Sequence, residues 1–232
     1  MKHLVVLSGA GISAESGIQT FRDSNGLWEN YAIEDVATPE AWRKNAELVQ
    51  SFYNLRRKQV LEAQPNEAHL YFAGLESRFR VTVVTQNIDD LHERAGSTNV
   101  LHLHGNIRKA KSSGPNPDKK LYPVTGNNIE MGELCDDGFQ LRPHVVWFGE
   151  EVPEMSRAAE VCATADYLVV VGTSLQVYPA AGLAFAAPQD AVKFLLDPGC
   201  EGLSVDDQFV KLPYRATEGV KVLDRLLTKY ED

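Results

Sequence analysis

Short runs of apolar, β-branched residues recur along the chain and constrain its fold more than any other feature. The runs are almost wholly apolar rather than alternating, which is typical of strands buried on both faces of a parallel sheet. Helical patterns at Glu47–Ala63 and Ala216–Tyr230 lie among them. The sequence therefore predicts an α/β fold, with functional groups at the carboxyl ends of the strands. The runs are His3–Ser8, Val81–Thr85, Val100–Leu103, Tyr167–Val171 and Val192–Leu196.

Composition excludes several classes of protein. A chain of 232 residues suits one domain, or one large lobe with a small insert. The formal net charge of -9 argues against a partner that is nucleic acid or an anionic membrane surface. The uncharged run over 167–189 is broken by glycine and prolines, so we expect no membrane span. Three widely spaced cysteines form no disulfide framework, and we expect a cytoplasmic location.

Two stretches interrupt the alternation of strands and helices. Residues 28–78 look helical without a convincing strand, and residues 110–138 look loop-like. We expect both to be inserts that form a smaller helical and loop lobe. The larger, nucleotide-binding lobe would then comprise residues 1–27, 79–109 and 139–232.

A glycine-rich turn follows the first run directly. Glycines at 9 and 11, with Ala14 in the third place, match the dinucleotide fingerprint of the Rossmann fold, although an ordinary tight turn is the alternative. The expected acidic residue about 20 positions later would be Glu29, which lies in no strand-like run. A nucleotide is thus indicated, while hydride transfer by a dehydrogenase is not supported. The expected nucleotide-binding residues are Gly9, Ala10, Gly11, Ser13 and Ala14.

Further motifs follow in a fixed order: Ser13–Arg22, Thr85–Asp89, His104-Gly105, Leu141–Glu150 and Gly172–Ser174. With these motifs the chain resembles the sirtuin family of NAD-dependent protein-lysine deacylases along nearly its whole length. The resemblance implies a Rossmann-like lobe, a smaller lobe, NAD as co-substrate and acylated lysines of proteins as substrates. One departure is Gln19, where the family usually has proline.

The resemblance assigns a set of residues to NAD. Taken alone, Asn87, Asp89, Thr173 and Ser174 are good helix caps. As family motifs, the segment 86–89 implies contacts to the nicotinamide ribose and carboxamide, and the segment 172–174 contacts to a phosphate or ribose. The full set is Phe21, Arg22, Gln86, Asn87, Ile88, Asp89, Gly172, Thr173, Ser174, Asp197 (ribose, where the family commonly has Asn) and Ala216 (adenine).

His104 directly follows the third run, and His102 lies two residues earlier. A histidine there has a pKa near working pH and suits a general base. The resemblance selects His104, with Asn87 and Asp89 as further catalytic residues. In sirtuins the acyl oxygen attacks the ribose, nicotinamide leaves, and the histidine removes a ribose hydroxyl proton. The products are free lysine, nicotinamide and O-acyl-ADP-ribose.

The helical pattern at Glu47–Ala63 spaces Phe52 and Leu55 for one apolar face. Tyr53 and Arg56, three residues apart, share a face as well. From the residues alone, a solvated amphipathic helix accounts for this pair as well as a binding site does.

Three further residues enter through the resemblance. Val146, Phe148 and Gly149 fall in the family's substrate-binding strand, where a peptide adds by main-chain pairing; a core strand is the alternative.

The acyl specificity is also read from the resemblance. Tyr53 and Arg56 match the Tyr-x-x-Arg of the subgroup that removes succinyl and malonyl groups, and a guanidinium fork with a phenol is a good carboxylate receptor. Ala37 matches the small residue that widens that pocket. We therefore expect desuccinylase, demalonylase and deacetylase activity.

Many sirtuins carry a structural zinc on two cysteine pairs, and a closed site needs about four such ligands. Only Cys135 lies between Gly105 and Leu141, so we expect no metal. Three alternative functions stay open: mono-ADP-ribosyl transfer, deacetylation only, and NAD binding without turnover.

Overall fold

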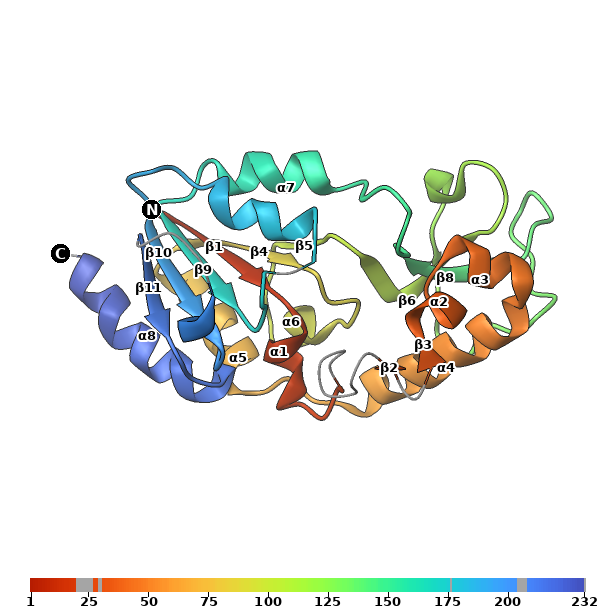
Figure 1. Cartoon of the computed structure of the whole chain (residues 1–232), viewed down its shortest axis with the longest axis horizontal. Helices are drawn as coiled ribbons and strands as arrows, with labels where there is room; N and C mark the ends of the chain where they lie inside the picture. The colour runs from red at the N-terminus through yellow and green to blue at the C-terminus, as the bar shows by residue number, and fades with distance from the viewer. Residues whose placement is uncertain (20–26, 29–30, 176, 204–207, 232) are drawn as a thin grey trace.

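The computed structural model describes residues 1–19, 27–28, 31–175, 177–203 and 208–231. Its centre is a six-stranded sheet in the order β11-β10-β9-β1-β4-β5, in which every neighbouring pair is parallel. The prediction of an α/β fold around a parallel sheet is confirmed (Figure 1). The strands are β1 (His3–Ser8), β4 (Arg80–Thr85), β5 (Val100–His102), β9 (Tyr167–Val171), β10 (Val192–Leu196) and β11 (Phe209–Leu212). The last was not predicted.

Both faces of the sheet are covered, which explains why its strands are apolar throughout. Leu4 and Val6 face one core cluster with helices α5 (Glu67–Gly74) and α8 (Ala216–Glu231). Val5 and Leu7, one residue out of phase, face a second cluster with α7 (Met155–Cys162) and the 3₁₀ helix η4 (Ala180–Phe185). Figure 1 shows α7 on one side of the sheet and α5 and α8 on the other. Since successive side chains of a strand point to opposite faces, no position in β1 is left for a polar surface.

The order of the strands reverses at β1. The chain moves from β1 to β4 and β5 on one side and later adds β9, β10 and β11 on the other. Ligands of open α/β sheets bind in the crevice at the carboxyl ends of the strands beside such a reversal. Short helices begin at this edge: α1 (Ala10–Ala14), α6 (Leu91–Arg94) and η5 (Cys200–Gly202), while η2 (Leu75–Ser77) precedes β4.

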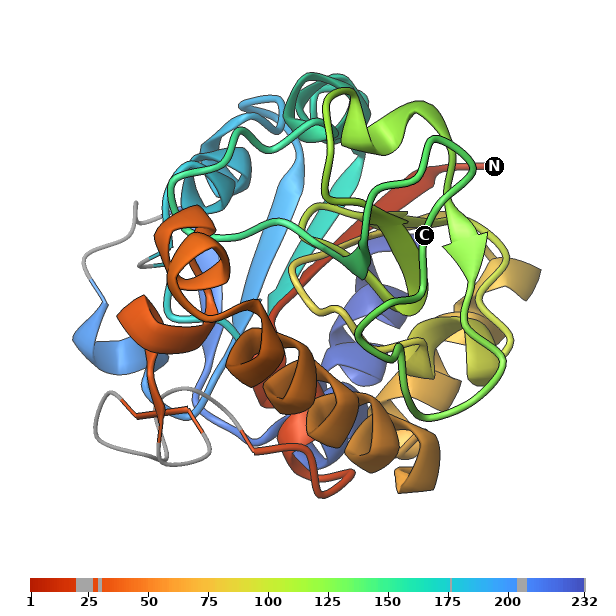
Figure 2. The ribbon, with the colours of Figure 1, turned by 90° about the vertical axis from the view of Figure 1, so that its right-hand side faces the viewer.

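A second part of the molecule lies beyond this edge. It contains α2 (Ile33–Val36), α3 (Pro39–Lys44) and α4 (Ala46–Glu62), together with a three-stranded antiparallel sheet in the order β7-β6-β8. Figure 2 looks onto this part and shows its helices in orange and brown beside the green strands. The strands of the antiparallel sheet are β6 (Gly105–Ser112), β7 (Tyr122–Pro123) and β8 (Leu141–Val145), and η3 (Pro117–Lys119) lies between the first two.

The structure corrects two details of the predicted inserts. Residues 28–78 were expected to hold no strand, but the short strands β2 (Leu27–Trp28) and β3 (Tyr31–Ala32) pair antiparallel. Residues 110–138 were expected to be a loop, but β6 continues to Ser112 and β7 pairs with it. Cross-strand pairing, which the sequence pattern does not show, makes these segments strands. The lobe boundaries at 27, 78, 109 and 138 stay a prediction.

Helix α4 holds the segment 110–138 through buried polar groups. Arg57 is fully buried and donates to three oxygens: Ile107 O at 2.8 Å, Asn54 Oδ1 at 2.7 Å and Asn127 O at 3.0 Å. Asn54 in turn exchanges hydrogen bonds with the Ile129 backbone at 3.1 and 3.0 Å. Two side chains one helical turn apart thus tie the segment to the rest of this part.

Candidate active site at the carboxyl edge of the parallel sheet

Two glycine-bearing turns, one after β1 and one after β9, pack directly against each other. The Gly11 N–H donates to the Gly172 carbonyl across 2.8 Å. A Cβ atom on Gly11 would lie 2.7 Å from the Gly172 Cα, and Gly172 has a φ of +62°. Gly9 is similarly close to Thr173, while Ala10 is exposed and Ala14 ends α1. The close packing of the two loops is therefore sufficient by itself to require glycine at positions 9, 11 and 172, whether or not a nucleotide binds.

Ser13 joins the glycine turn to the segment that follows β4. Its hydroxyl accepts from Asn87 Nδ2 at 3.1 Å and donates to Asp89 Oδ2 at 3.0 Å. Asn87 also donates to the Gly9 carbonyl at 3.2 Å. All three polar side chains are buried. Burial raises the pKa of the Asp89 carboxyl. This rise is opposed by hydrogen bonds from the Leu91 N–H and the Ser13 hydroxyl and by the charge of His102.

The capping alternatives fare differently. Asp89 Oδ1 accepts from the N–H of Leu91, the first residue of α6, but the N-cap of this helix is Asp90, so Asp89 forms a turn just before the helix while it binds Ser13. Thr173 Oγ1 accepts from the Leu175 N–H of its own loop at 3.2 Å and from Gln86 Nε2, on the loop after β4, at 3.4 Å. The next helix, η4, begins at Ala180, so neither Thr173 nor the half-buried Ser174 caps it.

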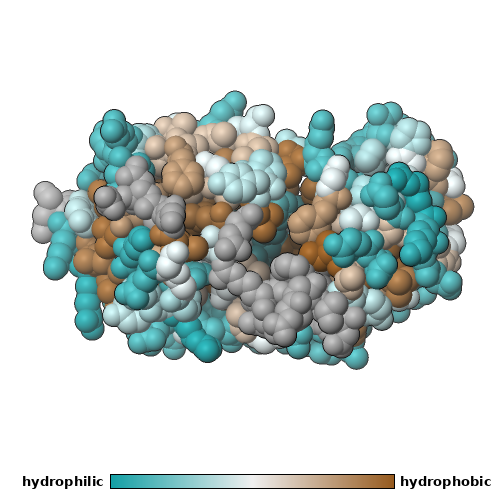
Figure 3. All heavy atoms as spheres, in the orientation of Figure 1, coloured by the Kyte–Doolittle hydropathy of each residue, from teal (hydrophilic) through white to brown (hydrophobic). Residues whose placement is uncertain are grey.

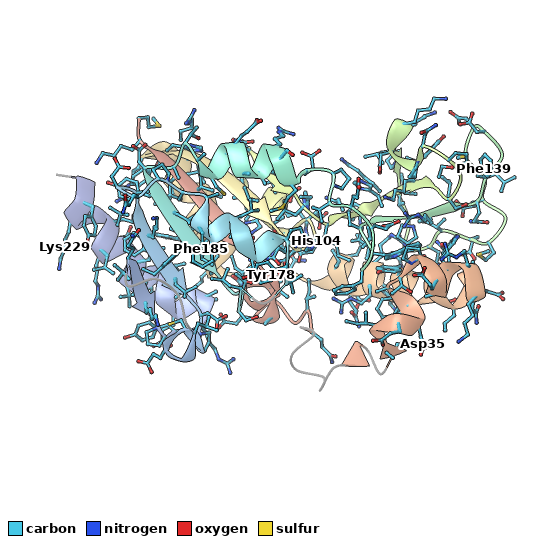
Figure 4. All side chains as sticks on the ribbon, turned by 45° about the horizontal axis from the view of Figure 1, so that its top comes forward. Asp35, His104, Phe139, Tyr178, Phe185 and Lys229 are labelled. Atoms are coloured by element: carbon cyan, nitrogen blue, oxygen red, sulfur yellow. The ribbon has the colours of Figure 1, made fainter. Side chains whose placement is uncertain are left out.

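His104 is bound to the backbone through one of its two ring nitrogens. Its Nδ1 lies 3.0 Å from the carbonyl oxygen of Gln86. Because a carbonyl only accepts, Nδ1 carries the hydrogen and Nε2 keeps a lone pair. Burial lowers the pKa of His104, and the bond to Gln86 partly opposes this, so the ring is neutral at pH 7. Figure 4 places His104 between the two parts of the molecule.

The expected peptide-binding segment starts where β8 ends. Val146 N–H donates to the His104 carbonyl and Phe148 N–H to the Ala37 carbonyl, each at 3.0 Å. Trp147 N–H donates to Glu150 Oε2 at 2.8 Å. Gly149 has a φ of +90°, and half of Phe148 is exposed. The segment is therefore a bent connection fixed to both His104 and Ala37 rather than a core strand.

The expected acyl-binding residues lie together in one buried cluster. Tyr53 and Ala37 belong to it, and Ile88 of the nicotinamide segment packs against it. Arg56 is only 4% exposed and donates to Gln59 Oε1 at 3.2 Å. Burial raises the pKa of Tyr53, and the Trp147 side chain and the charges of Arg142 and Arg56 oppose this. Tyr53 and Arg56 are therefore buried, and the alternative that they lie on a solvated helix face is wrong. Leu55, which the helical spacing placed on the apolar face, is 44% exposed.

Some predicted residues lie apart from this group. Asp197 follows β10 and accepts from the Gly199 N–H at 2.9 Å, while Ala216 starts α8 and is buried in the core. Phe21 and Arg22 lie outside the described residues. The face in Figure 3 is hollowed near the middle of the molecule, between its two parts. A second hollow of about 400 Å³, lined by Lys2 and Asp166 among others, lies at the opposite, amino-terminal edge of the sheet.

Two charged pairs at the site escaped the sequence analysis. His102 contacts Glu93 at 2.6 Å. Arg142 contacts Glu150 at 2.5 Å and lies over the Trp147 ring, 3.8 Å from its centroid. Glu93 is nine residues before His102, and Glu150 is eight after Arg142, so no helix or strand spacing joins them. Only the motif Leu141–Glu150, which holds both Arg142 and Glu150, carried a signal.

The described part of the chain contains neither a cluster of metal ligands nor a membrane-spanning helix. Within the described ranges, no three His, Cys, Asp or Glu side chains are grouped to hold a metal ion. Cys135 is buried and lies 3.4 Å from Ser112 Oγ. The absence of zinc stays a prediction. No helix in the described part of the chain is long and apolar enough to cross a membrane.

Comparisons with known proteins agree with this geometry. The model of the Sir2 family matches residues 9–179. An NAD-dependent protein deacylase of Bacteroides thetaiotaomicron is 50% identical over 98% of both chains, and one of Vibrio vulnificus strain YJ016 is 44% identical over 99% of this chain and 96% of the other. The crystal structure of a Sir2 homolog–NAD complex matches with a TM-score of 0.85 at 39% identity, covering 100% of this chain and 91% of that one. The chain belongs to the Sir2 family.

Proposed function

We propose that this protein is an NAD-dependent protein-lysine deacylase. The observation that carries the proposal is the link between His104 and a buried polar group: His104 Nδ1 is bound to the carbonyl of Gln86, and the next residue, Asn87, belongs to the hydrogen-bonded group Asn87–Ser13–Asp89 at the sheet's carboxyl edge. The names of the relatives from Bacteroides thetaiotaomicron and Vibrio vulnificus support it.

The donor set fits NAD. Buried amide and carboxyl groups at 87 and 89 suit a carboxamide and ribose hydroxyls, and glycines in the paired turns would let the main chain approach a phosphate closely. We assign Gly9, Gly11, Gln86 and Thr173 to the phosphates and riboses, together with the other nucleotide-binding residues predicted above. Asp197 and Ala216 are assigned to the adenosine end. When bound, NAD supplies an activated ribosyl carbon that accepts the acyl oxygen.

The residues divide the chemistry between them. Asn87 and Asp89 bind and orient the nicotinamide ribose. His104 accepts a ribose hydroxyl proton at Nε2, since its Nδ1–H is held by Gln86. Asp89 accepts from the Leu91 N–H and from Ser13, so its orientation is fixed before substrate arrives.

The substrate peptide would lie along residues 146–149. The N–H groups of Val146, Trp147 and Phe148 already donate within the chain, so a peptide would pair with the carbonyl groups of this segment or with the Gly149 N–H. Main-chain pairing of this kind tolerates many side chains. We infer broad recognition of acylated lysines in proteins.

We propose that Tyr53 and Arg56 bind the carboxylate of succinyl and malonyl groups, with Ala37 leaving room for them. The buried Arg56 beside a buried phenol supports this, because a charge held in low dielectric gains most from a carboxylate partner. Arg142 adds a second positive charge near Tyr53. Acetyl groups, which need no such partner, remain substrates.

We further propose that the protein works in the cytoplasm and carries no zinc. Its three cysteines are free and buried, in keeping with a reducing compartment. Elemental analysis of the purified protein checks the metal, and one zinc per chain would overturn this part.

Nicotinamide release measures the proposed function. The purified protein should release nicotinamide from NAD when an acetyl-, succinyl- or malonyl-lysine peptide is added, and only slowly without it. Release that needs an arginine acceptor instead would favour mono-ADP-ribosyl transfer. Binding of NAD without release would favour a binding module.

A further inference from the structure

Both ring nitrogens of His102 face hydrogen-bond acceptors. Nδ1 lies 3.1 Å from the Asn87 carbonyl oxygen, and Nε2 lies 2.6 Å from Glu93 Oε1. A carbonyl and an ionised carboxylate only accept, so each nitrogen must carry a hydrogen and the ring is an imidazolium. The Asn106 amide nitrogen also lies 3.3 Å from Nε2, a longer and weaker contact.

The surrounding charges favour the protonated ring. Glu93 on α6 and Asp89 in the loop stabilise the positive charge, while His92 on α6 and His144 on β8 oppose it. Burial alone would lower the pKa of His102, but the bond to Glu93 and its charge outweigh burial and raise it. Burial likewise raises the pKa of Glu93, and the hydrogen bond to His102, the charge of His102 and that of Lys109 reverse this.

His102 and His104 form hydrogen bonds with successive carbonyl groups of one segment, residues 86 and 87. His104 Nδ1–H donates to the carbonyl of Gln86, and His102 Nδ1–H donates to that of Asn87. The side chain of Asn87 donates to Gly9 and Ser13 from the same residue. The backbone of the expected nicotinamide segment is therefore fixed from one side by two histidines and from the other by the glycine turn.

We propose that His102, held as an imidazolium between Glu93 and the Asn87 carbonyl, is a positioning residue that fixes residues 86–89 for cleavage of the nicotinamide–ribose bond of NAD. The proposal rests on the proposed function, since it assigns that bond to this segment. His102 itself touches no reacting atom.

The two histidines then impose opposite requirements on pH. His104 works when neutral, and its lowered pKa puts its loss of activity on the acid side. His102 works when charged, and its raised pKa keeps it charged to a higher pH than an ordinary histidine. As the pH rises further, His102 loses one proton and must release either Glu93 or Asn87. The profile of kcat/KM for NAD should therefore have an alkaline limb that belongs to His102.

Two variants test this assignment. His102→Gln keeps a side-chain donor but loses the charge and one of the two bonds. We expect it to lower kcat/KM for NAD about tenfold, the loss of one charge-assisted hydrogen bond, and to remove the alkaline limb. Glu93→Gln is milder, because Glu93 is 39% exposed, and should shift the limb to lower pH. The KM for the peptide should stay unchanged in both. Glu160→Gln, the same charge change at an exposed position of α7, should leave the profile as it is.

A direct titration separates this proposal from the proposed function. Nuclear magnetic resonance of the histidine rings in the substrate-free protein should give His102 a pKa above 6.5 that falls in Glu93→Gln. A His102 pKa at or below 6.5, or a wild-type alkaline limb retained in His102→Gln, would overturn the positioning role. Absence of nicotinamide release by the wild type would instead overturn the proposed function, whatever the titration shows.

Discussion

The Nδ1–H of His104 donates to the carbonyl of Gln86 across 3.0 Å, and this single bond sets the chemistry of the ring. It fixes the tautomer, leaving the lone pair on Nε2 to accept a proton. It also joins the proposed general base to the segment proposed to hold the nicotinamide ribose. The proposed general base and the proposed ribose-binding segment are therefore linked through the Gln86 carbonyl.

Replacing His104 with alanine should reduce kcat by about 10²- to 10⁴-fold, the usual contribution of a positioned general base. The affinity for NAD should change little, because Asn87 and Asp89 keep their partners Gly9 and Ser13. Nicotinamide release and calorimetric NAD binding measure the two quantities. A variant that keeps more than a tenth of the wild-type kcat would rule His104 out as the base.

Arg56→Met should separate the acyl specificities. Loss of a charged hydrogen-bond donor to the acyl carboxylate costs about 1.5–3 kcal/mol, so kcat/KM for succinyl- and malonyl-lysine peptides should fall about 10- to 150-fold. Deacetylation should stay within about threefold.

Lys58→Met is the matched control, because Lys58 lies two residues along the same helix and is exposed. It should leave all three peptides unaffected. Full desuccinylation by Arg56→Met, with deacetylation also intact, would show that the carboxylate binds elsewhere.

Gly11→Ala should damage the nucleotide site through packing. Its new Cβ would lie 2.7 Å from the Gly172 Cα, and backbone atoms there cannot rotate away. We expect about 1–3 kcal/mol of destabilisation and a large loss of NAD affinity, measured by chemical denaturation and calorimetry. Gly182→Ala, whose Cβ would meet nothing within 4 Å, should be nearly neutral. Equal effects of the two substitutions would show that close packing of the turns is not the cause.

Arg57→Met should loosen the segment 110–138. It removes three hydrogen bonds and leaves the buried Ile107 carbonyl without this donor, which costs about 2–4 kcal/mol. For a chain of this size that corresponds to a fall in Tm of roughly 4–16 °C. Limited proteolysis should become faster within 110–138. Arg43→Met, at an exposed position of α3, is the control, and a loss no greater than its own would contradict the role of Arg57.

The parallel sheet was predictable because burial on both faces leaves a direct mark on the sequence. The runs at 3–8, 167–171 and 192–196 have the bounds of β1, β9 and β10. β11 was missed because only its two end residues are buried, so it lacks the continuous apolar run of its neighbours. The small strands β2, β3 and β7 were missed because two residues are too few to show a strand pattern, and only their cross-strand pairing defines them.

The site was predictable where chemistry is carried by contiguous motifs and not where it is carried by contacts across the fold. The segment 86–89 and His104 stand in such motifs and lie together in the structure. The pairing of His102 with Glu93, and the burial of Arg57 on a helix that also exposes Leu55, depend on tertiary packing. Helical spacing alone placed Leu55 inside, because it cannot tell which of two overlapping faces meets a neighbour.

NAD-dependent removal of acyl groups from lysine can be tested by quantifying all the products of a single reaction. The protein, NAD and a succinyl-lysine peptide are incubated together, with an acetyl-lysine peptide in parallel, and every product is quantified by mass spectrometry. For each peptide, we predict that nicotinamide, free-lysine peptide and O-acyl-ADP-ribose form in equal amounts. Deacylated peptide without O-acyl-ADP-ribose, or NAD left intact, would contradict it.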